Sequence, residues 1–153
     1  MLYNSYFWIT IETIDTLKKP HSEAIIHLQL IEYYLKWCYA LMHKGKVQKN
    51  FQEIKKMPMG KFIDNFKILD FSDNNPYLNN EDYKHLRKVT KKRNFYVHKF
   101  FTEFLIAKNN NDYETLKKLY EDLQNDLKIM KDLYNSVLKF YNKILDVYKR
   151  NDG

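Results

Sequence analysis

The last third of the chain repeats apolar residues at alternating intervals of four and three positions, and this repeat constrains the fold more than any other feature. No glycine or proline interrupts it. Since an α-helix places residues three and four apart on one side, the pattern predicts one long C-terminal helix that begins near Asp112. The repeat consists of Leu116, Tyr120, Leu123, Leu127, Met130, Tyr134, Val137, Tyr141, Ile144 and Tyr148.

Such a helix must bury its apolar side. At 1.5 Å per residue it would extend roughly 55 Å, which is longer than a small domain is wide. The apolar side therefore forms either the core of a bundle or a seam with a second subunit. We expect an all-α fold, an antiparallel bundle of four to five helices, with residues 1–150 as a single domain.

Helical spacing of apolar residues also occurs over residues 3–18 and 22–42. Pro20 lies between these segments, and because proline breaks helix interiors we expect it to separate two helices. The lysine-rich stretch 44–57 is expected to be a polar connection. A short helix carrying Phe62, Ile63 and Phe66 should follow it.

The run from Asp73 to Pro76 predicts a turn, after which Asn79 or Asn80 should cap a helix over residues 81–107. Within this helix, residues 84–102 contain seven Lys and Arg residues and no Asp or Glu. Such a concentration of positive charge attracts polyanions, although a solvated lysine surface has the same composition.

Arg93 is the most informative residue of this helix, because the whole chain has only three arginines. An arginine among many lysines suggests a need for a planar fork of donors that binds phosphate or carboxylate in two places. The helical wheel places Arg93 within the apolar side formed by Leu86, Val89, Val97, Phe100 and Phe104. A guanidinium there requires an acidic partner or a water-filled cleft.

Asn94 and His98 are four residues apart and so should lie together at the edge of the same side, beside Arg93. This pattern of Arg, a polar residue, a short spacer and His resembles the signature of the HEPN superfamily (higher eukaryotes and prokaryotes nucleotide-binding). The resemblance covers residues 81–107. It implies a helical bundle that dimerises with two motifs face to face, and in many members a metal-independent endoribonuclease that acts as a toxin or defence effector.

RNA cleavage of this kind requires proton transfer at the 2′-hydroxyl and the leaving 5′-oxygen, together with positive charge on the phosphate. The resemblance makes Arg93, Asn94 and His98 the expected catalytic residues, with a 2′,3′-cyclic phosphate as product. Phe95 is expected either to stack on a base or to pack against another helix. The expected RNA-binding residues are Lys84, Lys88, Lys91, Lys92, Phe95 and Lys99.

The sequence departs from the family in one respect. In members controlled by a partner nucleotidyltransferase, a tyrosine two residues after the histidine receives a nucleotide, and this chain has Phe100 there, with Tyr96 nearby. Two alternatives to a ribonuclease therefore stay open. One is a non-catalytic module of HEPN type that binds RNA, nucleotides or a partner nucleotidyltransferase, and the other is a helical scaffold for protein interaction. For a toxin, the expected partner is an antitoxin or a nucleotidyltransferase.

Other chemistry has little support in the sequence. The five histidines are scattered and none pairs with a Cys or acidic residue at zinc-ligand spacing, so we expect no metal and no cofactor. The single Cys38 cannot form an internal disulfide and should be a core residue. No apolar run approaches membrane-spanning length, and the cytoplasm is the expected compartment.

Overall fold

The computed structural model describes residues 11–148, with side chains from residue 15 onward. Over this range the chain forms six α-helices and no strand, so the predicted all-α fold is confirmed. The helices are α2 (Ile11–Met42), α3 (Val47–Ile54), α4 (Met59–Asp70), α5 (Asn80–His98), α6 (Phe100–Asn109) and α7 (Tyr113–Val147). None of them is long and apolar enough to cross a membrane.

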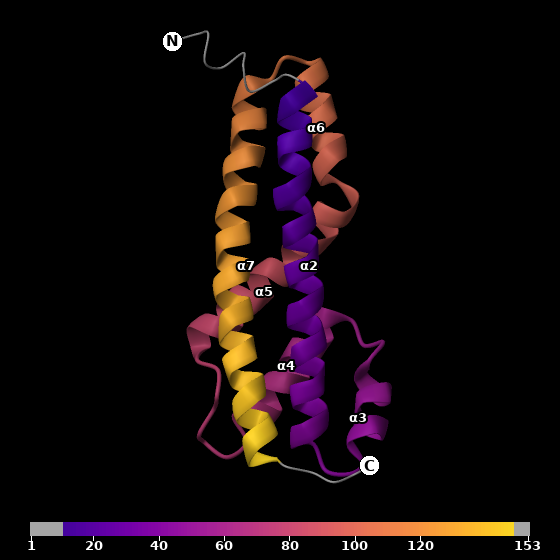
Figure 1. Ribbon diagram of the computed structural model, residues 1–153, viewed down its shortest axis with the longest axis vertical. Helices are drawn as coiled ribbons and strands as arrows, with labels where there is room; N and C mark the ends of the chain where they lie inside the picture. The colour runs from indigo at the N-terminus through magenta and orange to yellow at the C-terminus, as the bar shows by residue number, and fades with distance from the viewer. Residues whose placement is uncertain (1–10, 149–153) are drawn as a thin grey trace.

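The two longest helices, α2 and α7, lie side by side along the molecule (Figure 1). They run parallel, not antiparallel as predicted for the bundle, because residues 23, 27 and 34 of α2 contact residues 131, 134 and 141 of α7 in that order. The helices α5 and α6 return the chain in the opposite direction. This return brings α5 against both α2 and α7, which is what places the candidate site.

The long C-terminal helix forms as predicted, with the Asp112 side chain accepting a hydrogen bond from the backbone of Thr115 at its start. Its apolar side is the core of the bundle and packs within the subunit. Six positions of the repeat are buried, and Tyr120, Tyr134 and Tyr141 are half-buried beside them. The buried ones are Leu116, Leu123, Leu127, Met130, Val137 and Ile144.

The prediction that Pro20 separates two helices is wrong, because α2 continues through it. Pro20 has no backbone N–H to donate to the preceding turn. Leu17 and Ala24 are nevertheless fully buried on either side, so one straight helix packs both turns against the core. Residues 3–10 of the first predicted helix lie outside the described residues.

The stretch 44–57 is not only a connection, since it contains the short helix α3. Phe51 and Ile54 bury its apolar side against the core. Asn50 is also buried, and its amide donates to the carbonyl oxygens of Ala40 (3.1 Å) and His43 (3.1 Å). Thus α3 both covers the bundle and satisfies the carboxyl end of α2.

The helix predicted over residues 81–107 is in fact two helices that meet at Lys99. Asn79 caps α5 in a capping box with Asp82, as predicted. At the other end, His21 Nε2 lies 2.6 Å from the carbonyl oxygen of Tyr96, next to the break. This hydrogen bond from α2 satisfies a backbone acceptor where the helix is interrupted.

The burial of the side chains on α5 and α6 differs from the prediction at one position. Leu86, Val89, Phe100 and Phe104 are buried as predicted, whereas Val97 is 47% exposed and the neighbouring Tyr96 is buried. Val97 precedes the break, on the same helix as Leu86 and Val89, and it lines an open pocket instead of packing on another helix. The surface beside His98 is therefore more open than expected.

Candidate functional site

A pocket of about 620 Å³ lies between α2, the start of α4, and α5. Arg93, Asn94 and His98 all line it, so the structure brings together the three residues that the sequence pattern singled out. The other lining residues are Ile25, Leu28, Gln29, Pro58, Met59, Thr90, Lys91 and Val97.

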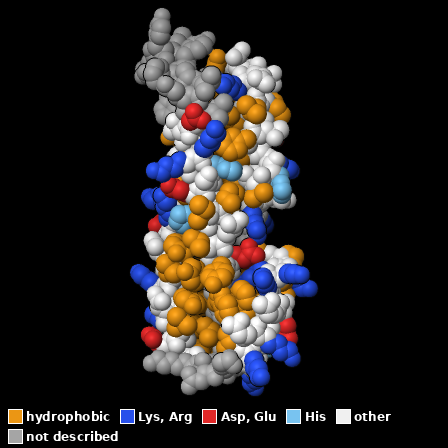
Figure 2. Space-filling view, turned by 45° about the vertical axis from the view of Figure 1, so that its right-hand side comes forward, with side chains coloured by type: hydrophobic (Ala, Val, Ile, Leu, Met, Phe, Trp, Pro, Cys, Tyr) orange, Lys and Arg blue, Asp and Glu red, His pale blue; other side chains and the backbone are white. Residues whose placement is uncertain are grey.

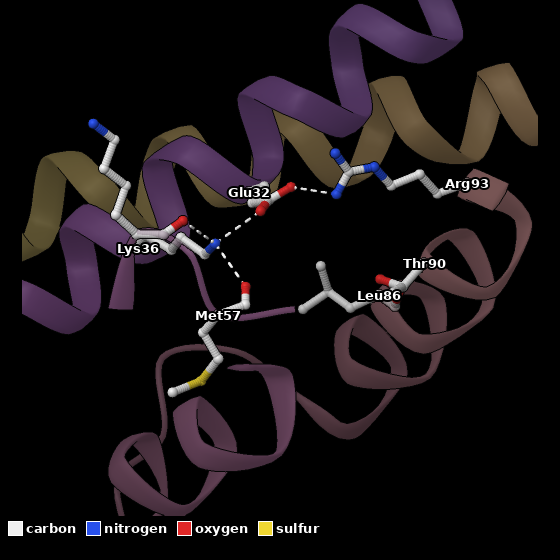
Figure 3. Close-up of polar contacts among 7 residues, drawn as sticks. Glu32, Lys36, Met57, Leu86, Thr90 and Arg93 are labelled. Carbon is white, nitrogen blue, oxygen red and sulfur yellow. Dashed lines mark hydrogen bonds and ion pairs between the residues drawn. The ribbon is translucent and has the colours of Figure 1, made fainter. Parts of the chain in front are cut away.

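Arg93 has both the acidic partner and the cleft that its position requires. Its Nη1 lies 2.7 Å from Glu32 Oε2, and its side chain is 41% exposed (Figure 3). Glu32 comes from α2 and does not line the pocket. The carboxylate thus engages one nitrogen of the guanidinium, and the guanidinium has further N–H groups for an anion in the pocket.

Glu32 is itself held by Lys36, one turn further along α2. Lys36 Nζ donates to Glu32 Oε1 (2.8 Å) and to the carbonyl oxygens of Lys55 (2.9 Å) and Met57 (2.9 Å). An ammonium group has three N–H donors, so all of them are used although Lys36 is only 3% exposed. The network joins α2 to the segment between α3 and α4 and fixes the carboxylate that holds Arg93 (Figure 3).

Neither Glu32 nor Lys36 was identified from the sequence. A signal for Glu32 existed, because it is the only acidic residue between Glu23 and Glu53. Helical spacing indicates Lys36, four positions further along α2, as one cationic partner of this carboxylate. The second partner, Arg93, lies 61 positions away in the sequence, and the spacing within either helix does not indicate that pairing.

His98 and Asn94 lie on the exposed rim of the pocket. His98 is the last residue of α5. Its two ring nitrogens can donate or accept a hydrogen bond to a ligand in the pocket, beside the guanidinium of Arg93. Asn94 offers both an amide donor and a carbonyl acceptor.

The predicted RNA-binding lysines divide into two groups. Lys84, Lys88, Lys91 and Lys99 are exposed, and Lys91 lines the pocket. Lys92 instead forms an ion pair with the buried carboxylate of Asp126, at 2.7 Å. Since leaving that buried charge unpaired would be costly, Lys92 has a structural role.

Phe95 packs edge-to-face against Tyr96 and Phe100 and does not line the pocket. Phe95 was expected either to stack on a base or to pack within the protein, and the structure shows that it packs. Tyr96 is buried and its hydroxyl donates to Asp126. Burial and this hydrogen bond raise the pKa of Tyr96 well above its usual range, so the hydroxyl is neutral and its position is fixed.

Cys38 is fully buried, as predicted for a core residue, and burial raises the pKa of its thiol. The thiol therefore stays protonated and is a poor nucleophile, because only the thiolate is reactive. Comparison of the chain with protein-family models, curated proteins and solved structures found no match.

Proposed function

We propose that this protein is a metal-independent endoribonuclease of HEPN type that acts as a homodimer. The observation that carries the proposal is the meeting of Arg93, Asn94 and His98 in one pocket. These side chains supply positive charge, a neutral polar group and a proton-transfer group. Positive charge and proton transfer are what a 2′-hydroxyl requires to attack the adjacent 3′-phosphodiester.

In this mechanism Arg93 binds the scissile phosphate and stabilises the negative charge of the phosphorane. His98 transfers a proton, and Asn94 orients the phosphate or the imidazole. The 2′-oxygen bonds to phosphorus as the bond to the 5′-oxygen breaks, which gives a 2′,3′-cyclic phosphate and a 5′-hydroxyl. Glu32 holds the guanidinium in place by accepting a hydrogen bond from one of its nitrogens.

The reaction requires two proton transfers, one from the 2′-hydroxyl and one to the leaving oxygen. His98 is the only histidine that lines the pocket in the described part of the chain. A second copy of the chain, related by a twofold axis, would supply the second imidazole. This requirement is the chemical reason for proposing a dimer.

A role as a toxin or defence effector, with an antitoxin or nucleotidyltransferase as partner, follows from the family resemblance. The second candidate function is RNA or nucleotide binding without cleavage. The ion pair with Glu32 favours it, because the carboxylate offsets part of the Arg93 charge that would stabilise a transition state. RNA turnover distinguishes the two candidates.

The decisive experiment measures cleavage of single-stranded RNA in EDTA by purified His98→Ala and Arg93→Ala proteins. Each variant should lose at least about 100-fold in rate, the usual contribution of a proton-transfer group or a charge-stabilising donor. Arg93→Lys should also be impaired, since an ammonium cannot replace the fork.

The matched controls are His85→Ala and Arg87→Ala, on the same helix and outside the pocket. Both should retain wild-type rates. Circular dichroism and thermal unfolding establish that each variant is folded. Full activity of a folded His98→Ala protein, or loss of wild-type activity in EDTA, would exclude the mechanism.

A further inference from the structure

The apolar residues that line the pocket have no part in the chemistry described above. They are called the apolar side here and consist of Ile25 and Leu28 of α2, Pro58 and Met59 at the start of α4, and Val97 of α5. We propose that the apolar side binds one nucleobase of the RNA, next to the phosphate at Arg93. The inference rests on the proposed function, because it assigns the remainder of the same pocket.

The dimensions and chemistry of the pocket fit a nucleotide better than a phosphate alone. Its volume of about 620 Å³ falls within the roughly 300–1,000 Å³ of small-molecule sites, which combine apolar walls with a few polar groups. A phosphate is recognised by donors and gains nothing from aliphatic walls. The flat faces of a base are apolar and are stabilised by contact with Leu28, Met59 and Val97.

Two polar side chains of the lining are placed to meet the edge of the base. The Thr90 hydroxyl donates to the carbonyl oxygen of Leu86 at 2.6 Å, so its oxygen remains as an acceptor toward the pocket. Gln29 is exposed on α2 across from Thr90 and offers both an amide donor and a carbonyl acceptor. Together they can hydrogen-bond the donors and acceptors of a base edge.

A base can enter such a pocket only when it is unstacked and unpaired. The inferred ligand is therefore a nucleotide of single-stranded RNA, with its phosphate at Arg93 and its base against Val97 and Met59. A duplex would present its phosphates to the basic surface of α5 without filling the apolar side. Cleavage at unpaired nucleotides follows from this geometry.

The experiment uses the full chain labelled with ¹³C at the methionine methyl groups, because Met59 lines the pocket and Met130 is fully buried in the core away from it. The four nucleoside 3′-monophosphates, ribose 5-phosphate and inorganic phosphate are titrated separately. At least one nucleotide should shift the Met59 signal saturably and leave the Met130 signal in place. Neither ribose 5-phosphate nor inorganic phosphate should do so.

Matched variants test the contact itself. Val97→Ala should raise the Kd of the nucleotide about fourfold, which corresponds to the loss of roughly one buried methylene. Val147→Ala, at an exposed valine of α7, should leave it unchanged. Gln29→Ala should weaken binding, and Gln52→Ala on α3 should not.

The base-binding inference is overturned if no nucleotide shifts Met59, if inorganic phosphate shifts it equally, or if Val97→Ala binds like Val147→Ala. The experiments distinguish failure of the base-binding inference from failure of the proposed ribonuclease function. Cleavage that depends on His98, with no Met59 response, would keep the ribonuclease and remove the base pocket. A Met59 response in a protein that does not cleave RNA would keep the pocket and remove the ribonuclease.

Discussion

Single residues at the candidate site are connected by charge more than by packing. Lys36, Glu32 and Arg93 alternate in sign, and the first of them is almost completely buried. A buried cation is tolerated because its three donors are satisfied and a carboxylate faces it. The stability of this part of the bundle and the orientation of Arg93 therefore depend on the same carboxylate.

Glu32→Gln should destabilise the protein by about 3 kcal/mol, because Lys36 would remain buried without a counter-charge. Adding Lys36→Met should recover part of this loss, because it removes the buried ammonium that Glu32→Gln leaves without a counter-charge. Urea unfolding of both variants measures the difference. Glu23→Gln, which removes a more exposed pair with Lys131, is the control and should change stability much less.

If the double variant is less stable than Glu32→Gln, the buried Lys36 does not destabilise the protein when it lacks the carboxylate. The RNA cleavage rate separates the two roles of the carboxylate. Even where the double variant regains stability, it should stay slow, because Arg93 has lost the group that directs it.

Much of the site at residue scale could be predicted from the sequence. The convergence of Arg93, Asn94 and His98 follows from helical spacing, and the need of Arg93 for a partner follows from its apolar surroundings. The identity of that partner could not be predicted, because Glu32 lies on another helix. The ion pair of Lys92 with Asp126 was missed for the same reason.

The helices show where local sequence rules compete with tertiary packing. Capping by Asn79 and Asp112 was predictable, because each cap is a contact between residues three positions apart. Continuation of α2 through Pro20 and interruption of α5 at Lys99 were not. In both places the local preference is overruled by residues that pack on the core from both sides.

Pro20→Ala tests this competition in α2. Alanine restores a backbone donor inside the helix, a gain of about 3 kcal/mol, and loosens the unfolded chain, a loss of about 1 kcal/mol. The net effect should be a stabilisation of about 2 kcal/mol, seen as a raised midpoint in urea. Pro76 lies in the turn before α5, so Pro76→Ala restores no hydrogen bond inside a helix and should not stabilise the protein. A destabilised Pro20→Ala protein would mean that the helix is adapted to the proline.

The basic surface of α5 provides a second test at the scale of the helix. Lys84, Lys88 and Lys91 are exposed and should each release about 0.7 counterion when they contact single-stranded RNA. Changing all three to Gln should reduce the slope of log Kd against log salt by about 2. The same change at Lys128, Lys139 and Lys143 of α7 alters net charge equally and should leave the slope unchanged. Equal slopes in both triple variants would mean that α5 is only a solvated surface.

At the scale of the whole molecule, the bundle buries its long heptad helix internally and exposes apolar side chains elsewhere. Figure 2 shows hydrophobic side chains gathered on the lower half of one face, where α2, α3 and α7 meet. The aromatic face is defined here as Tyr33, Tyr34, Trp37, Phe51 and Tyr141. Phe51 is buried and stacks on the Trp37 ring at 4.0 Å, and Tyr34, Trp37 and Tyr141 are half-buried. Tyr33 is 50% exposed, and Ile26 on the same side of α2 is 51% exposed.

This face is the surface on which the proposed second copy should pack. Tyr33 lies one helical turn from Gln29, a residue that lines the pocket, so the aromatic face adjoins the pocket where we propose that a second imidazole acts. From the sequence, the apolar side of the heptad helix was expected to form either the bundle core or a subunit seam. In the structure that side is largely filled by α2, which moves the proposed seam to the outer side of α2.

Light scattering of the wild-type protein at micromolar concentration should therefore give twice the chain mass. Tyr33→Lys should reduce it to one chain mass, because a charge at the centre of an apolar interface is left unpaired on dimerisation. Val147→Lys, an exposed residue near the end of α7, should stay dimeric. Because the proposed mechanism uses His98 from both copies, the Tyr33→Lys monomer should bind RNA but cleave it no faster than His98→Ala. A wild-type monomer that cleaves RNA would show that one imidazole suffices, and the twofold site would have to be abandoned.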